Sequence, residues 1–398
     1  MGKRLEILAA LAAGIVAAGW AGAGAAGAAG WQRIPVPTAQ ILEAVDFPAP
    51  DVGYAVGRRS TVIATRDGGV TWGALPLPPE LAEDDAHAVA FRDAHSGFVV
   101  GGSVGLRRGF VARTHDGGRT WAVVERAPDA LRAVAVWGPT VVAVGNSGAV
   151  VRSGDDGATW DVTVGTGART ESPTRRDADV LRAVAFLGSA AEVVAVGDDG
   201  AIERSRDAGH TWRSIPFNYQ KFDGLTMTFG MAPLGPGAWA MGGHDIRVDE
   251  RTNFGGIRFT RNDGATFVGA EVRPEMHNVD AIRRSSGGLL AATSRFVGRE
   301  ELGTILRSGD GGRSWRPIFA QRDGPFLDLA APAQGRIVAV GTGGRVYATG
   351  LAAAPWAAAP PPLPGFGADG RLTAPVDAAP APPEPARARL GAAAAFGL

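Results

Sequence analysis

The sequence predicts an all-β protein, a seven-bladed β-propeller of four-stranded blades, from three observations. An eight-residue pattern, Ser/Thr-x-Asp-x-Gly-x-Thr/Ser-Trp, recurs six times, with departures only in the fifth copy. Each copy follows three short apolar runs separated by turn residues, and successive copies are 39 to 55 residues apart, close to the period of propeller blades. A seventh unit is divided between the two ends of the chain, so we expect an N-terminal strand to join the last blade and close the ring.

Length and composition narrow the class of protein. A chain of 398 residues exceeds what one ordinary core would hold, and a repeat is the usual solution. The formal net charge is zero, so nucleic acid is not an expected partner. The absence of cysteine excludes thiol catalysis, disulfides and cysteine-ligated zinc. Because the six histidines show no metal-binding spacing, we expect neither a metal nor another cofactor.

Residues 1–30 have the order of a secretory signal. Lys3 and Arg4 precede an apolar run from Leu5 to Ala18, and small residues follow up to Gly30. We therefore expect an exported protein, periplasmic, lumenal or extracellular. The alternative is an uncleaved membrane anchor, since the stretch to Ala29 is long enough to span a bilayer.

The recurring pattern has a physical basis in a tight turn. The aspartate accepts hydrogen bonds from backbone N–H groups, the glycine adopts a positive φ, and the aromatic side chain is buried just beyond the turn. The six pairs of aspartate and aromatic positions are Asp67 and Trp72, Asp116 and Trp121, Asp155 and Trp160, Asp207 and Trp212, Asn262 and Phe267, and Asp310 and Trp315. By these residues the pattern resembles the Asp-box, or BNR, repeat of sialidases and related propellers.

Each box lies between the third and fourth strands of a predicted blade. The clearest unit is 181–217, where LRAVAFL, EVVAVGDDG, AIERSRD and TWRSIPF indicate four short strands. Equivalent units are expected at 41–78, 86–126, 131–164, 224–273 and 278–321. Residues 326–349 supply three strands of a seventh blade, and Trp31-Gln-Arg-Ile-Pro is the expected fourth. The propeller is thus expected at 31–350, and the alanine- and proline-rich residues 351–398 as a disordered tail.

The two faces of the predicted disc differ. Because turns alternate between the faces, the boxes share one face, and the loops between second and third strands and between blades share the other. The long insertions at 101–109, 164–180, 242–256 and 294–303 fall on this second face, where variable loops usually bind partners. The arginines singled out in them are Arg107, Arg108, Arg175, Arg176, Arg247, Arg251 and Arg299. The alternative is a solvated face whose charges only confer solubility.

The second residue of each first strand should lie near the central channel. Alignment of the repeats places Glu43, His87, Arg132, Arg182, Leu225 and Asp280 there. Two adjacent arginines, Arg132 and Arg182, could hold a carboxylate or a peptide backbone. Equally, they could pair with Glu43 or Asp280 around the rim, an arrangement that contributes little energy.

The residues do not favour an enzyme. Arg33-Ile34-Pro35 resembles a sialidase signature, but the same offset from Trp recurs after other boxes, and of three tyrosines only Tyr219 lies outside a predicted strand. A glycosidase would need two carboxylates from the loops of blades 5 and 6, and the candidates are Asp245, Asp249, Glu250, Glu300 and Glu301. These loops have few aromatic side chains for sugar stacking. The dipeptide His244-Asp245 is interpreted as a chance pair.

The whole repeat resembles that of the photosystem II stability and assembly factor family. Arg182-Ala-Val-Ala-Phe, Val194-Ala-Val-Gly-Asp-Asp-Gly-Ala-Ile and the box of 205–212 carry the resemblance, which extends over about 31–350. It implies a non-catalytic scaffold that binds a membrane-complex subunit or its precursor. It also implies an arginine patch on one face, matched here by Arg58, Arg59, Arg132 and Arg182. Glu43, Leu225 and Asp280 depart from an all-arginine ring.

The resulting hypothesis is an exported, monomeric scaffold that binds a protein partner on the face opposite the boxes. Its N-terminus offers a possible route to the membrane. Two alternatives stay open at this point: a glycoside hydrolase that uses the loops of blades 5 and 6, and a structural disc displayed through its tail.

Overall fold

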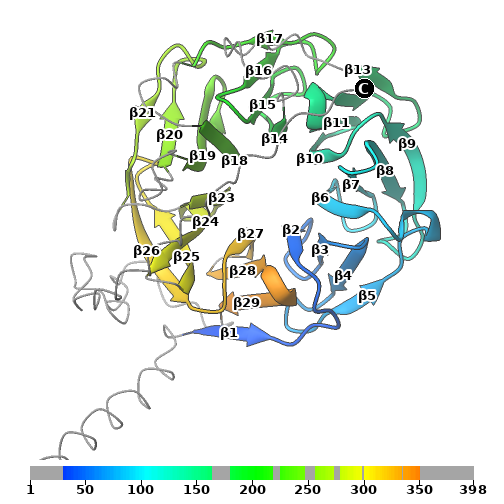
Figure 1. Cartoon of the computed structure of the whole chain (residues 1–398), viewed down its shortest axis with the longest axis horizontal. Coiled ribbons are helices and arrows are strands. Elements are labelled where there is room, and N and C mark those ends of the chain that lie inside the picture. The colour runs from blue at the N-terminus through cyan, green and yellow to red at the C-terminus, as the bar shows by residue number, and fades with distance from the viewer. Residues whose placement is uncertain are drawn as a thin grey trace, which may run out of the picture.

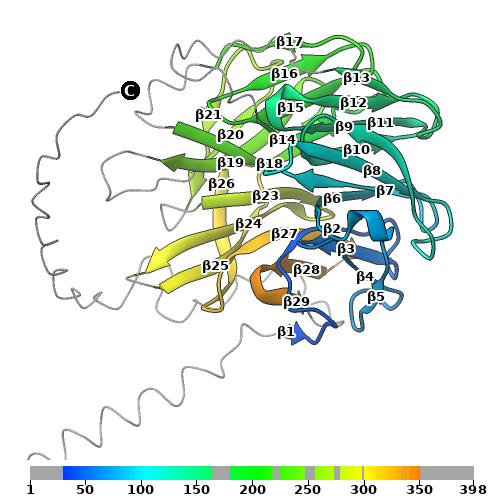
Figure 2. The ribbon, with the colours of Figure 1, turned by 45° about the vertical axis from the view of Figure 1, so that its right-hand side comes forward.

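The computed structural model describes residues 30–163, 180–217, 225–246, 256–272, 278–297, 300–333 and 335–349. Seven antiparallel sheets are arranged radially around a central channel, as Figure 1 shows along the short axis of the molecule and Figure 2 at an angle. The predicted seven-bladed propeller is therefore confirmed. No helix within these residues is long and apolar enough to cross a bilayer.

Blades 1 to 3 each consist of four consecutive strands. Blade 1 contains β2 (Leu42–Asp46), β3 (Gly53–Gly57), β4 (Thr61–Thr65) and β5 (Gly73–Leu75). Blade 2 follows the short helix η1 (Pro79–Leu81) and contains β6 (Asp85–Phe91), β7 (Gly97–Ser103), β8 (Arg108–Thr114) and β9 (Ala122–Ala127). Blade 3 contains β10 (Leu131–Trp137), β11 (Thr140–Gly145), β12 (Val150–Ser153) and β13 (Asp161–Thr163), with η2 (Asn146–Gly148) between β11 and β12.

Blades 4 to 6 repeat this order, and the first two strands are longer in blades 5 and 6. Blade 4 contains β14 (Leu181–Phe186), β15 (Val193–Gly197), β16 (Ile202–Ser205) and β17 (Arg213–Ser214). Blade 5 contains β18 (Leu225–Gly235), β19 (Ala238–Ile246), β20 (Gly256–Thr260) and β21 (Val268–Gly269). Blade 6 contains β23 (Asn278–Ser285), β24 (Gly288–Val297), β25 (Glu300–Ser308) and β26 (Ser314–Gln321).

Two of the expected loop insertions are largely strand. Pairing between β24 and β25 continues from Leu289↔Ser308 to Val297↔Glu300, so 294–303 extends a hairpin. Pairing between β7 and β8 likewise continues to Ser103↔Arg108. Regular ladders form there because each extended backbone satisfies the hydrogen bonds of its neighbour.

The N-terminal segment closes the ring in blade 7. This blade contains β27 (Phe326–Ala333), β28 (Arg336–Gly341), η4 (Thr342–Gly344) and β29 (Arg345–Thr349). Strand β1 (Trp31–Ile34) pairs antiparallel with β29, from Trp31↔Thr349 to Ile34↔Val346 (Figure 1). The Trp31 ring stacks on Phe319 of blade 6, with 4.4 Å between ring centroids. The predicted closure is confirmed, and it covers the outer edge of β29.

A fifth strand on blade 6 has no signal in the repeat pattern. After β21 the chain forms β22 (Glu271–Val272), which pairs in parallel with β26 of the next blade. The backbone N–H of Glu271 also donates to the carbonyl of Arg313 over 2.8 Å. Blade 5 is therefore joined to blade 6 at the outer rim.

The core consists of apolar layers between neighbouring blades. Between blades 1 and 2, Tyr54 and Val56 pack against Val99 and Phe110, all fully buried. The Tyr54 ring stacks on Phe91, with 3.7 Å between centroids. Since successive side chains of a strand point to opposite sheet faces, the buried apolar residues of each second strand contribute to two such layers at once.

The six boxes form the predicted turns on one face, called here the box face. In blade 2, Asp116 accepts hydrogen bonds from the backbone N–H and the hydroxyl of Thr120, over 2.9 and 2.6 Å, and one from the Thr114 hydroxyl over 2.9 Å. These bonds lower the pKa of Asp116 to about 2 because they stabilise the charged form. In blade 5 the amide of Asn262 replaces the carboxylate and donates to the Thr266 hydroxyl over 2.9 Å.

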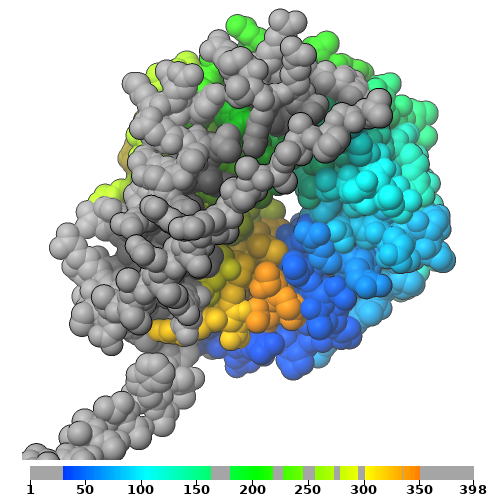
Figure 3. All heavy atoms as spheres, viewed as in Figure 1, coloured from blue at the N-terminus to red at the C-terminus, as the bar shows by residue number. Residues whose placement is uncertain are grey.

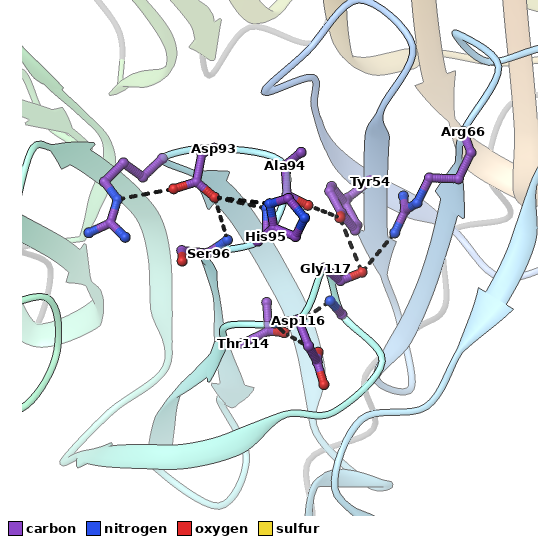
Figure 4. Close-up of polar contacts among 11 residues, drawn as sticks. Tyr54, Arg66, Asp93, Ala94, His95, Ser96, Thr114, Asp116 and Gly117 are labelled. Carbon is purple, nitrogen blue, oxygen red and sulfur yellow. Dashed lines mark hydrogen bonds and ion pairs between the residues drawn. The ribbon is translucent and has the colours of Figure 1, made fainter.

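Arginines connect four of the six box turns to the preceding blade through a backbone carbonyl. The residue after the box aspartate has a positive φ in these turns, and its carbonyl accepts a hydrogen bond from an arginine of the blade before. Figure 4 shows the bond from Arg66 to the carbonyl of Gly117, which measures 2.7 Å, together with the bond from the Tyr54 hydroxyl to the same carbonyl at 3.1 Å. Equivalent donors are Arg113 to Asp156, Arg152 to Ala208 and Arg261 to Gly311. Hydrogen bonds on the box face thus hold neighbouring blades together.

The opposite face, called here the mouth face, is defined by strand direction. First strands begin there, second strands end there, and third strands run from there to the boxes. Because β29 is a third strand, it ends at Thr349 on the box face, and β1 begins there at Trp31.

Candidate binding site at the channel mouth

Each first strand is interrupted by a β-bulge where it enters the channel on the mouth face. The register shifts leave one residue per blade without a ladder partner. These bulge residues are Glu43, His87, Arg132, Arg182, Phe229, Asp280 and Leu327. A bulge re-aims its side chain, and here all seven line one cavity.

The sequence alignment was wrong in blade 5. It placed Leu225 at the channel, but the equivalent residue is Phe229, because β18 begins with an additional segment that pairs with the end of β19 (Leu225↔Ile246). The unassigned seventh position is Leu327. The other five positions are confirmed as bulge residues.

A glycine opposite the bulge explains the recurring Val-Ala-Val-Gly sequence. An added Cβ on Gly197 would lie 1.9 Å from the carbonyl oxygen of Val180, and one on Gly57 would lie 1.8 Å from that of Ile41. Contacts this short exclude a side chain. Glycine is therefore required where the second strand passes the bulge of the first strand. The motif therefore places the residue after the glycine beside the bulge residue.

The bulge residues surround a cavity of about 250 Å³ at the centre of the propeller. Figure 3 shows the central opening between the blue and cyan blades on one side and the yellow and orange blades on the other. A space of this size admits one or two side chains or an extended segment. The lining is mostly polar, so its charges decide what can enter.

In four blades the bulge residue contacts the residue that follows the glycine. Glu43 forms an ion pair with Arg58 at 2.5 Å, and Arg182 forms a bidentate pair with Asp198 at 2.5 and 2.8 Å. Arg132 donates to the Asn146 side chain over 2.9 Å. Phe229 packs against the His244 ring, with 4.5 Å between centroids.

Blades 1 and 2 form a compensated cluster. Arg58 also binds Asp85 at 2.7 Å, and His87 Nδ1 donates to Glu43 over 2.6 Å. Burial raises the pKa of Glu43, but the hydrogen bond from His87 and the charge of Arg58 outweigh it, so this pKa lies below its usual value. Arg58 thus has two carboxylate partners here, and the predicted role of Arg58 at the mouth is partly structural.

Arg132 is the exception. Its guanidinium donates to the Asn146 side chain over 2.9 Å and lies 3.4 Å from Nε2 of His87, and neither contact is to a carboxylate. No carboxylate of the described residues lies within ion-pair distance of it. Burial lowers the pKa of Arg132, and the positive charge of nearby Arg182 lowers it further. Arg132 therefore carries a partly desolvated charge without a counter-ion from this part of the chain.

The alternative pairing of these arginines is also corrected. Arg182 binds Asp198, not Glu43 or Asp280, and its guanidinium carbon lies 4.5 Å from the centroid of Phe229. Arg132 pairs with neither acid. Side chains from the same blade are closer than those across the channel, which is why the local partner prevails.

The opposite side of the mouth is acidic. The Asp280 carboxylate lies 3.3 Å from Nε2 of His244 on the neighbouring blade. Burial raises the pKa of Asp280, His244 lowers it, and Glu301 raises it. His244, interpreted from the sequence as a chance neighbour of Asp245, thus contacts another acid.

Below the mouth, two carboxylates accept hydrogen bonds from the backbone edges of first strands. Asp46 accepts from the N–H of Phe91 over 2.7 Å, and Asp328 accepts from the N–H of Val45 over 3.0 Å and from Arg283 over 2.9 Å. First strands face the channel with their free edges, and these carboxylates satisfy some of their donors. Burial raises the pKa of Asp46 to about 6.

The remaining predicted residues are dispersed or lie outside the described residues. Arg59 is exposed in the turn after β3, and its N–H donates to Asp85. Arg108 pairs with buried Asp84 at 2.8 Å, whereas Arg107 is 75% exposed. The residues outside are Arg175, Arg176, Arg247, Arg251 and Arg299, together with Tyr219, Asp249, Glu250 and most of 164–180.

Catalytic carboxylates gain no support from the described residues. The box aspartates are occupied by turn hydrogen bonds on the opposite face. Of the five loop carboxylates, Asp245 lies in β19 and Glu300 and Glu301 lie in β25. Tyr54 and Tyr347 lie in β3 and β29, where Tyr54 is fully buried.

One family model matches the N-terminal part of the chain. The model described as photosynthesis system II assembly factor YCF48 matches residues 23–180, which include blades 1 to 3 and the bulge residues of all three. Over these residues, which are less than half of the chain, the protein is similar to the photosystem II assembly factor family. A chloroplastic photosystem II stability/assembly factor HCF136 from Cyanidioschyzon merolae is 46% identical over 46 residues, which is 11% of this chain and only 10% of the relative.

Solved structures agree on the fold. A structure titled YCF48 bound to D1 peptide matches with a TM-score of 0.56 at 20% identity, over 80% of this chain and 96% of that one. YCF48 from Cyanidioschyzon merolae matches with a TM-score of 0.59 at 18% identity, over 81% and 99%. The GH74 xyloglucanase from Xanthomonas campestris matches with a TM-score of 0.60 at 19% identity, over 82% of this chain but 54% of the enzyme. At such identities these likenesses show a shared propeller alone.

Proposed function

We propose that this protein is a non-catalytic, exported scaffold that binds an extended segment of a protein partner at the channel mouth. The observation that carries the proposal is Arg132, a partly buried guanidinium that contacts Asn146 and His87 and forms no ion pair with a carboxylate of the described residues. Such a group favours a carboxylate or a backbone carbonyl, which it can bind in a bidentate manner.

The size and placement of the cavity support a segment rather than a folded domain. About 250 Å³ accommodates side chains but no second core. The mouth face also carries Arg107, which is largely exposed, and the β7–β8 hairpin tip with Leu106 62% exposed. A partner could contact these residues while one of its side chains enters the mouth.

One comparison supports the proposed class of partner. A related structure is titled YCF48 bound to D1 peptide, and we extend from it the proposal of a membrane-complex subunit or its precursor as the partner. Export through residues 1–30, as a cleaved signal or an anchor, would place the scaffold in the compartment where such segments emerge. We propose that it acts as a monomer.

Direct binding measurements test this proposal. Peptides tiled across the exported segments of the source organism's membrane-complex subunits, and the D1 peptide itself, are titrated by fluorescence anisotropy. We expect Arg132→Glu to weaken the best peptide by at least about tenfold, since a charge-assisted bond is replaced by repulsion. Arg119→Glu, on the exposed box face, is the matched control and should not change affinity.

Circular dichroism shows whether each variant folds, and Arg132→Gln provides a milder substitution if Arg132→Glu does not. Equal affinity of native protein and Arg132→Gln for every binding peptide would refute the site. Absence of binding by any tiled peptide would refute the partner class.

A further inference from the structure

The mouth is bipolar, and its acidic half is not explained by an arginine-based site. Around the ring, His87, Arg132 and Arg182 are followed by Phe229, Asp280 and Leu327. Because Asp198 neutralises Arg182, the positive charge without an ion pair among the described residues lies on blade 3, at Arg132, and a negative charge lies on blade 6, at Asp280. A segment that satisfied Arg132 alone would leave Asp280 facing it.

Asp280 is an incompletely satisfied carboxylate. Its side chain is 12% exposed, and its Oδ2 atom is buried without a hydrogen-bond partner. Nε2 of His244, its neighbour at 3.3 Å, also lacks a hydrogen bond of acceptable geometry. Buried polar atoms without partners are rare in native proteins, and each requires an explanation. A missing cation from a bound molecule is such an explanation.

Phe229 keeps the two poles apart. Its ring lies 4.5 Å from the Arg182 guanidinium carbon and 4.5 Å from the centroid of the His244 ring. Arg182 is held by Asp198 and by this ring, so it is not available to neutralise Asp280. The aromatic ring thus preserves a separation of charge that direct pairing across the mouth would remove.

We propose that the mouth binds a segment with two opposite charges, an acidic group at Arg132 and a lysine or arginine side chain at Asp280, with apolar atoms over Phe229. This inference rests on the proposed function and specifies the chemistry of its partner. An extended strand advances about 3.3 Å per residue, so the spacing of the two charges along the segment selects the partner. The two charges also fix its direction across the mouth.

Capped peptides test the inference. The probes carry glutamate and lysine separated by one to four residues that include leucine, and matched probes carry norleucine in place of lysine. For the best spacing, we expect native protein to bind the lysine probe about tenfold more tightly than the norleucine probe, since a buried carboxylate gains a cation. In Asp280→Asn, which retains the side-chain shape, this difference should disappear.

Equal binding of the lysine and norleucine probes by native protein overturns the inference, as does a lysine preference that persists in Asp280→Asn. Failure of the proposed function gives a different result, in which neither probe binds or binding is insensitive to Arg132→Gln. A thermal unfolding curve for each variant verifies that the propeller is intact.

Discussion

Arg66 of blade 1 donates a hydrogen bond of 2.7 Å to the carbonyl oxygen of Gly117 in the box turn of blade 2. The same carbonyl accepts from Tyr54, whose ring lies 5.0 Å from the Arg66 guanidinium carbon. Because comparable bonds recur around the ring, neighbouring blades are joined by polar contacts as well as by their apolar layers.

Arg66→Ala should therefore weaken the junction between blades 1 and 2. We expect the free energy of unfolding to fall by about 1–2 kcal/mol, at the low end of the range for a hydrogen bond to a charged group because Arg66 is exposed. Urea denaturation measures this change, and Arg119→Ala, in the exposed part of the same turn region, is the control. A loss no larger than that of the control would show that the arginine contacts are incidental.

The box aspartates should make the fold sensitive to acid. Hydrogen bonds from Thr120 and Thr159 lower the pKa of Asp116 and Asp155 to about 2, below the ordinary value near 4. A lowered folded-state pKa contributes stability that is complete above about pH 4 and is lost as the pH falls toward 2. Denaturation midpoints should decline over this window.

Asparagine at both positions separates this effect from general acid unfolding. Asn262 already occupies one box with its turn hydrogen bonds intact. The double variant Asp116→Asn/Asp155→Asn should therefore fold, and its stability should depend less steeply on pH between 4 and 2. An unchanged slope would contradict the assignment.

Asp46 should have the opposite dependence. Burial raises its pKa to about 6, so its contribution to stability is complete below about pH 4 and is lost as the pH rises through 6. Asp46→Asn keeps an acceptor for the N–H of Phe91. At pH 8 we expect a gain on the order of 1–2 kcal/mol, after allowance for partial exposure, since one pKa unit corresponds to about 1.4 kcal/mol.

This gain should shrink toward zero by pH 4, as measured by urea denaturation across the range. A variant that is less stable than the native protein at pH 8 would mean that the charge of Asp46 is needed near Arg283.

The ring closure offers a further test. Trp31→Ala removes the stacking on Phe319 and should cost about 2 kcal/mol, less than for a fully buried tryptophan. Removal of 31–34 should in addition uncover the edge of β29 and promote self-association, seen by analytical ultracentrifugation. Gln32→Ala, an exposed position in the same strand, is the control. Monomeric, equally stable truncated protein would contradict closure by β1.

The features that could be predicted from the sequence are those whose residues recur in every repeat. Box turns, blade order and the role of Trp31 all depend on local chemistry that recurs, so one clear unit explains the others. The alignment of repeats was wrong in blade 5 because β18 has an additional segment before its bulge. The channel position was therefore assigned to Leu225 instead of Phe229.

The side chains that contact the mouth residues could not be predicted from the sequence for a different reason. Which acid binds Arg182 depends on the bulge and on the glycine opposite it, and these bring Asp198 closer than Glu43 or Asp280. The signal was nevertheless present, since a polar residue follows the glycine in blades 1, 3, 4 and 5. Strand β22 had no such signal, because only two residues form it.

The pairing of Trp31 with Thr349 also determines on which face the two ends of the propeller domain lie. Both strand ends emerge on the side of the boxes, opposite Arg132 and Asp280. A tether at either end, to a bilayer or to another polypeptide, would hold the disc by its box face. The cavity of the proposed binding site would then face away from the tether, where a partner could reach it.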